Sequence, residues 1–110
     1  MIFESPLPDV EIPEVSLPTY VLARASELGD KVAIIDGDVA LTFAEFDALV
    51  DRVAAALHAN GLAPGDRVAL LSRNSWQYAV LAFATPRAAV VLVPVNFMLT
   101  GEETAYILRH

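Results

Sequence analysis

The strongest hydrophobic pattern in the chain predicts a long amphipathic helix that begins after Thr42. Thr42 and Glu45 have the spacing of a capping box, in which each side chain accepts a hydrogen bond from the backbone amide of the other residue. Apolar residues then recur at helical spacing, so that one stripe faces a core: Phe46, Leu49, Val50, Val53 and Leu57. The pair Asn60 and Gly61 predicts the end of this helix.

A β-hairpin and a shorter helix are predicted ahead of the long helix. Val32–Ile35 and Val39–Leu41 are apolar runs separated by an acid-glycine-acid turn at residues 36–38, which is a strong hairpin signal. Residues 19–28 carry apolar positions near helical spacing and predict a short helix. Residues 1–18 are rich in proline, which disfavours helix, and we expect an extended arm lying on a surface.

The second half of the chain predicts a strand–helix–strand unit. Arg67–Leu71 and Val90–Val93 are short apolar runs, typical of strands that are covered on both faces, and Pro94 is expected to close the second run. The helix between them begins near residue 76, and Pro86 is expected to end or kink it. Two strands joined by a helix predict a right-handed crossover and a parallel pair.

A second capping box, Thr100 with Glu103, predicts a last helix that runs through Leu108. The fold class is therefore α/β, with an arm at residues 1–18 and an α/β unit at residues 19–110. The alternation of elements predicts a further strand, so we expect the chain to be a truncated piece. His110 is terminal, and the sequence shows no partner for it.

Composition and charge argue against several classes of protein. The 110 residues suffice for one domain, and 55% of them are hydrophobic. The net charge of −7 argues against nucleic acid as the main partner, and the absence of cysteine excludes disulfides and thiolate metal sites. Arg87 and Pro94 interrupt the apolar run from Trp76 to Leu99, so two short buried elements explain it better than a membrane span. We expect a cytoplasmic protein.

Polar residues that could bind a ligand lie in two loops that follow the predicted strands. Arg73, Asn74 and Ser75 open a helix, where anions are attracted, so Arg73 could touch a phosphate of CoA or of a nucleotide. Asn96 could line a substrate channel. Capping of the helix by Asn74 or Ser75, and a turn stabilised by Asn96, explain the same residue types without a ligand, and we favour that interpretation.

The remaining candidate residues also have structural explanations. Asp36 and Asp38 could form a carboxylate pair, but beside a hairpin glycine they are favoured as turn residues. His58 lies near a helix C-terminus, where positive charge is favourable. Trp76 and Tyr78 could stack on a base, yet no basic patch surrounds them, so packing between helix and sheet is favoured.

Several stretches together resemble the N-terminal region of the adenylate-forming enzymes, a superfamily of acyl-CoA synthetases, aryl-CoA ligases, luciferases and peptide-synthetase adenylation domains. The most informative is Gly61–Ser75, with the sequence GLAPGDRVALLSRNS. Three more stretches agree in order and spacing: Leu41–Phe46, Val93–Asn96 and Glu103–Leu108. Residues 5–13 are similar to the start of 4-coumarate–CoA ligase-like members. Two positions depart from the pattern: Pro86 stands where the family usually continues its helix, and Ala89 where glycine is common.

The resemblance implies an acid–CoA ligase. In that family a carboxylate attacks ATP, with magnesium, to give an acyl-adenylate and pyrophosphate, and the CoA thiol then displaces AMP. The family's phosphate loop, adenine-binding motif, ribose-binding aspartate and catalytic lysine lie downstream and have no counterpart here. We therefore predict no catalytic, cofactor-binding or metal-ligating residue in this chain, and we expect ATP, Mg²⁺ and CoA to bind the intact parent only.

A second interpretation stays open, in which the chain is a complete, small, acidic α/β interaction module without catalytic activity. In the first interpretation the partners are the missing remainder of the chain and a carboxylic acid, and the fragment alone is inactive. The acid itself is not fixed, although residues 5–13 favour 4-coumarate-like ligases over long-chain fatty-acid ligases. A parallel pair without neighbouring strands leaves an edge and apolar faces uncovered, so we expect self-association of the fragment.

Overall fold

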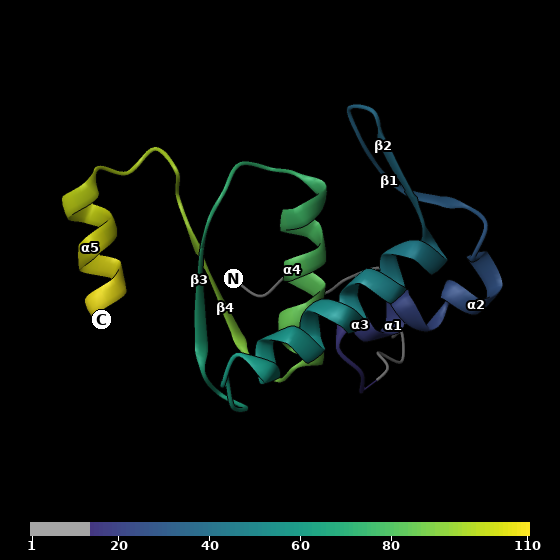
Figure 1. Cartoon of the computed structure of the whole chain (residues 1–110), viewed down its shortest axis with the longest axis horizontal. Coiled ribbons are helices and arrows are strands. Elements are labelled where there is room, and N and C mark those ends of the chain that lie inside the picture. The colour runs from purple at the N-terminus through teal and green to yellow at the C-terminus, as the bar shows by residue number, and fades with distance from the viewer. Residues whose placement is uncertain (1–13) are drawn as a thin grey trace, which may run out of the picture.

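The structure is a computed structural model that describes residues 14–110, and most of the predicted arm lies outside them. Its elements, in chain order, are α1 (Leu17–Ala23), α2 (Ala25–Leu28), β1 (Val32–Asp36), β2 (Val39–Thr42), α3 (Phe43–Ala59), β3 (Arg67–Leu71), α4 (Trp76–Arg87), β4 (Val91–Val95) and α5 (Gly101–Arg109). Figure 1 shows α3 and α4 next to one another, with the β1–β2 hairpin projecting at one end of the molecule and α5 at the other. The predicted α/β class is confirmed.

The N-terminal helix differs from the prediction in two ways. It begins at Leu17, within the predicted arm, because Pro18 fits the first helical turn, where its missing N–H is not needed. The Ser16 hydroxyl caps it by accepting from the backbone N–H of Thr19 at 3.4 Å. The single predicted helix is also wrong, since the chain breaks at Arg24 into α1 and α2.

The hairpin and the long helix are confirmed. β1 and β2 pair antiparallel, and Gly37 occupies the turn with a φ of +57°, a conformation that glycine adopts without strain. The capping box of α3 is complete. The Thr42 hydroxyl accepts from the Glu45 amide at 3.2 Å, and the Glu45 carboxylate accepts from the Thr42 amide at 2.9 Å.

The core lies where α1, α3, α4 and the start of β4 meet. Its buried members are Leu22, Phe46, Val50, Ala54, Val80, Ala84, Ala88 and Val90. The predicted stripe of α3 is confirmed, because Phe46 and Val50 are buried and its other members pack against this cluster. Phe46 also meets Phe83 of α4 edge to face, with ring centroids 5.2 Å apart.

β3 and β4 pair in parallel, as predicted, with Arg67 opposite Val91 and Leu71 opposite Val95. The predicted end of the second strand is wrong, because β4 runs through Pro94, which lies opposite Leu70. β3 and β4 form a sheet of two strands within the described residues, so β4 has a free edge. A proline is tolerated on such an edge strand, where one N–H is not needed by a neighbouring strand.

The end of α4 combines the two positions that depart from the family pattern. Pro86 stands in the last turn of the helix, which ends one residue later. Ala89 follows in the left-handed region, with a φ of +56°. Its amide donates to the Pro86 carbonyl at 3.1 Å, and the Val90 amide donates to the Thr85 carbonyl at 2.8 Å. These two bonds form a Schellman motif, which usually places glycine at the position of Ala89.

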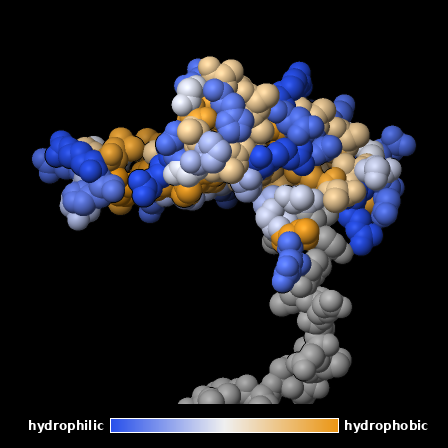
Figure 2. Space-filling model, turned by 90° about the horizontal axis from the view of Figure 1, so that it is seen from below, coloured by the Kyte–Doolittle hydropathy of each residue, from blue (hydrophilic) through white to orange (hydrophobic). Residues whose placement is uncertain are grey.

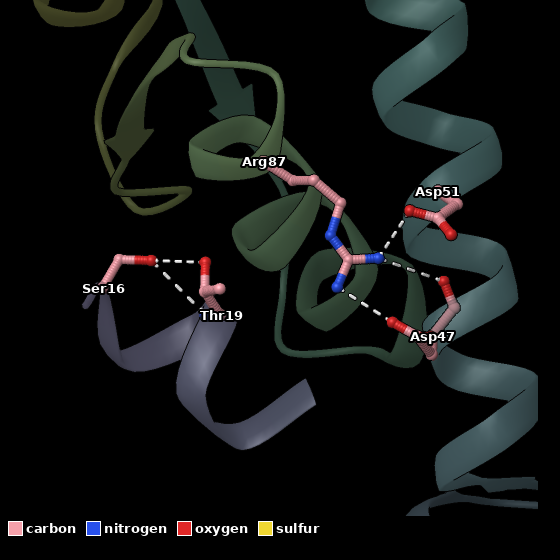
Figure 3. Close-up of polar contacts among 5 residues, drawn as sticks. All are labelled: Ser16, Thr19, Asp47, Asp51 and Arg87. Atoms are coloured by element: carbon pink, nitrogen blue, oxygen red, sulfur yellow. Dashed lines mark hydrogen bonds and ion pairs between the residues drawn. The ribbon is translucent and has the colours of Figure 1, made fainter. Parts of the chain in front are cut away.

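An ion-pair cluster joins α3 to α4 (Figure 3). Arg87 contacts the Asp47 carboxylate at 2.8 Å and the Asp51 carboxylate at 2.6 Å. Burial alone lowers the pKa of Arg87, but hydrogen bonds and charge from the two aspartates outweigh it and raise that pKa above its ordinary value. Asp47 and Asp51 lie one helical turn apart, so a single guanidinium bridges both carboxylates.

α5 begins with the second predicted capping box, which is also confirmed. The Thr100 hydroxyl accepts from the Glu103 amide at 3.4 Å, and the Glu103 carboxylate accepts from the Thr100 amide at 2.8 Å. Hydrogen bonds from the backbone and side chain of Thr100 lower the pKa of Glu103. Across residues 14–110, no helix is both long enough and apolar enough to cross a membrane.

Candidate functional site: the carboxyl edge of the parallel strand pair

The carboxyl ends of β3 and β4 meet at one edge of the sheet, because the strands are parallel. Two loops leave from this edge: residues 72–75 lead into α4, and residues 96–100 lead into α5. Ligands of open α/β sheets bind outside this edge. Arg73 lies in the first of these loops and Asn96 in the second.

The structure brings the two loops together through a pair that sequence reasoning did not find. The Arg73 guanidinium lies over the ring of Phe97, with its central carbon 5.0 Å from the ring centroid. Both side chains are exposed, and Phe97 keeps 46% of its accessible surface. A cation over an aromatic face is attracted by the ring quadrupole. Nothing in the sequence marks the pair, because its members are 24 positions apart and in different loops.

The N-terminus of α4 is already occupied by side chains of the chain itself. The Ser75 hydroxyl accepts from the Tyr78 amide at 3.1 Å, which confirms the predicted cap and assigns it to Ser75 instead of Asn74. The Asp36 carboxylate accepts from the Trp76 amide at 2.9 Å. A carboxylate is favourable at a helix N-terminus, and it repels any further anion there.

Asp36 therefore has a role that the hairpin pattern did not reveal. It is the last residue of β1, opposite Val39 across the turn, so its predicted place beside the turn is confirmed. Its contact with Trp76 joins residues 40 positions apart and links the hairpin to the first turn of α4. Asp38 lies in the turn, as predicted.

Asn96 stabilises a turn, as its favoured interpretation predicted. Its side-chain oxygen accepts from the Met98 amide at 2.9 Å, and its backbone carbonyl accepts from the Leu99 amide at 3.1 Å. This is the local bonding that asparagine typically provides in turns. The arrangement orders the loop just before α5.

The two histidines lie outside this edge, and both contact backbone carbonyls. His58 is in the last turn of α3, with Nδ1 3.0 Å from the Leu62 carbonyl, so its predicted location at the helix end is confirmed. His110 lies with Nδ1 2.9 Å from the Tyr106 carbonyl, and its ring stacks on Tyr106 at 4.2 Å between centroids. Sequence reasoning missed this partner.

An apolar hollow of about 350 Å³ lies beside the loop at residues 72–75, between α3, β3 and α4. Its lining residues are Leu49, Val53, Leu70, Ser72, Trp76, Gln77, Tyr78, Val80 and Leu81. Trp76 is partly buried and packs against the core, which supports its predicted packing role, and Tyr78 is partly buried. Among residues 14–110, no three histidine, aspartate or glutamate residues are grouped so that they could hold a metal ion.

Comparison with known proteins identifies the family. The family model described as AMP-binding enzyme matches residues 21–110. The chain belongs to this family of AMP-binding enzymes. It is 40% identical over 105 residues to 4-coumarate–CoA ligase 2 of Oryza sativa subsp. japonica, covering 93% of this chain and 18% of that protein.

Two further similarities concern fatty-acid ligases of Mycobacterium tuberculosis. The chain is 42% identical over 71 residues to long-chain-fatty-acid–CoA ligase FadD13, covering 64% of this chain and 14% of that one. It superposes on the crystal structure of the N-terminal domain of FACL13 with a TM-score of 0.80 and 35% identity, covering 86% of this chain and 25% of that one. The chain therefore spans about a fifth of the length of the curated relatives it matches.

Proposed function

We propose that this chain is the N-terminal part of an acid–CoA ligase. The intact protein would activate a carboxylic acid by attack of its carboxylate oxygen on the α-phosphorus of ATP, with Mg²⁺ bound and pyrophosphate leaving. The CoA thiol would then attack the carbonyl of the acyl-adenylate, release AMP and form a thioester. The observation that carries the proposal is the family match over residues 21–110, with acid–CoA ligases among the relatives.

We propose further that the chain alone catalyses neither step. Within the described residues, the carboxyl edge of the sheet carries one cation, Arg73, and the helix N-terminus beside it is occupied by Ser75 and Asp36. The chain would contribute structure: a hydrophobic core, a parallel strand pair and the helices that cover it. On this proposal, the N-terminal unit begins with α1 at Leu17, and the remainder of a longer protein supplies ATP, Mg²⁺ and CoA binding.

The sequence of the gene beyond the codon for His110 offers a direct test. A downstream serine-, threonine- and glycine-rich phosphate loop supports the proposal. If the reading frame closes at that codon, the ligase would have to be assembled from separate chains, or the proposal fails.

The biochemical test measures thioester formation by the longest protein that the gene encodes. With ATP, Mg²⁺, CoA and a panel of acids that includes 4-coumarate and fatty acids, we expect an acyl-CoA product with at least one acid. Absence of product with every acid, from protein that is folded and binds ATP, contradicts the proposal. The preferred acid then chooses between the aryl and fatty-acyl classes of the relatives.

A further inference from the structure

α5 packs loosely against the rest of the described chain. None of its residues is buried, and it makes no extensive contact with another helix or strand among residues 14–110. It has nine residues, and isolated helices shorter than about 12–15 residues are marginal in water. Its helical form and its position therefore depend on a few contacts near its ends.

The C-terminal end of α5 is poorly anchored. A hollow of about 420 Å³ is lined by Arg67, Ala69 and Val93 of the strands and by residues 107–110. Figure 2 shows apolar side chains exposed between the α5 end of the molecule and the main body. An open hollow gives few van der Waals contacts, so this end of the helix contributes little to holding it in place.

The N-terminal end of α5 is linked to the body by a continuous series of contacts. Arg73, in the loop before α4, lies over Phe97 at 5.0 Å. Phe97 lies inside the turn that Asn96 closes by accepting from the Met98 amide. Thr100 follows immediately as the cap of α5. The position of the Phe97 ring therefore determines, through this ordered loop, where the first turn of α5 lies.

We propose that Arg73 and Phe97 form a latch that holds α5 in position beside the sheet. While the latch is closed, the loop at residues 96–100 fixes the start of the helix. When it opens, loop and helix move away together and the short helix frays. This inference goes beyond the proposed function and does not depend on it, because it concerns only contacts within the chain.

Hydrogen–deuterium exchange of the α5 amides tests the latch on the full 110-residue chain. Arg73→Ala removes the cation, and Phe97→Leu removes the aromatic face while keeping an apolar side chain. An exposed cation–π contact predicts that each substitution speeds exchange of the α5 amides about two- to five-fold. In the double variant, exchange should be no faster than in the faster single variant, because both changes break the same contact.

Arg52→Ala is the matched control, since Arg52 is an exposed arginine on α3, away from the latch. It should leave α5 exchange unchanged, and exchange in α3 should be the same in every variant, which shows that the core is intact. Unchanged α5 exchange in either single latch variant overturns the proposal. So does a double variant whose effect equals the product of the two single effects, since the residues would then act independently.

Discussion

Two helices of this protein, α3 and α4, end in the same backbone motif, but one has glycine and the other alanine at its left-handed position. Exchanging glycine and alanine at these two positions should therefore change the stability of the protein in opposite directions. After α3, the Gly61 amide donates to the His58 carbonyl and the Leu62 amide to the Leu57 carbonyl, as in the motif after α4. Gly61 has a φ of +89°, whereas the corresponding residue after α4 is Ala89, at +56°. Gly61→Ala should destabilise the protein, and Ala89→Gly should stabilise it.

The expected change in the free energy of unfolding is the difference between two opposing backbone effects. An L-residue in the left-handed region costs about 1–2 kcal/mol relative to glycine. Glycine loses more conformational entropy on folding, by about 0.5–1 kcal/mol. Ala89→Gly should therefore raise the free energy of unfolding by about 0.5–1 kcal/mol. Gly61→Ala should lower it by a similar amount, because a Cβ at this position meets nothing within 4 Å and adds no clash.

Equilibrium urea unfolding, followed by far-UV circular dichroism, measures both variants against the parent chain. Ala48→Gly is the control, because Ala48 is exposed in the middle of α3, where glycine should cost about 1 kcal/mol. The control distinguishes the effect of glycine at a left-handed position from its effect at an ordinary helical position. The reasoning is refuted if Ala89→Gly destabilises the protein as Ala48→Gly does, or if Gly61→Ala leaves the unfolding midpoint unchanged.

Other substitutions and conditions test the packing and the caps. Val50→Ala, at a fully buried position of α3, should lower the free energy of unfolding by about 2 kcal/mol in the same urea assay; a cost below that of an exposed valine would contradict the assigned core. Arg87→Met should lower the free energy of unfolding by about 1 kcal/mol, because it removes the two ion pairs between α4 and α3, whereas Arg52→Met should leave it nearly unchanged. Equal losses of stability in the two variants would show that the ion pairs do not stabilise the protein. The pKa of Glu103 is lowered, so its cap stabilises α5 above the ordinary glutamate pKa and is lost as the pH falls through the lowered pKa. The protection factors of the amides in residues 100–103, which correct exchange for the pH dependence of an unprotected amide, should fall in that acid range. Glu103→Gln, which keeps the capping geometry, should abolish this fall; the same fall in the variant would show that Glu103 does not cause it. Light scattering should show self-association of the chain at rising concentration, which a monomer at all concentrations would contradict.

The elements that could be predicted from the sequence are those specified by local rules. The capping boxes at Thr42 and Thr100 and the hairpin turn at Gly37 depend on side chains within a few residues of one another, and all three are confirmed. The exposed Pro94 misled the prediction, because a proline is compatible with a strand only when that strand has a free edge. Whether a strand has a free edge depends on the tertiary structure.

The candidate site was only partly predictable, for the same physical reason. The local roles of Ser75 and Asn96 follow from their loop positions and are confirmed. The contacts of Asp36 with Trp76 and of Arg73 with Phe97 join distant segments and carry no periodic or motif signal. Such contacts exist only once the helices have packed, so a single sequence does not reveal them.

The central proposal is that this chain is a structural part of an acid-activating ligase and has no activity alone. The most direct measurement is acid-dependent exchange of labelled pyrophosphate into ATP, made in parallel on the 110-residue chain and on the longest protein that the gene encodes. We predict exchange with at least one carboxylic acid for the longer protein and none above background for the chain. Acid-dependent exchange by the chain alone, or its absence from a folded longer protein with every acid, would contradict the account.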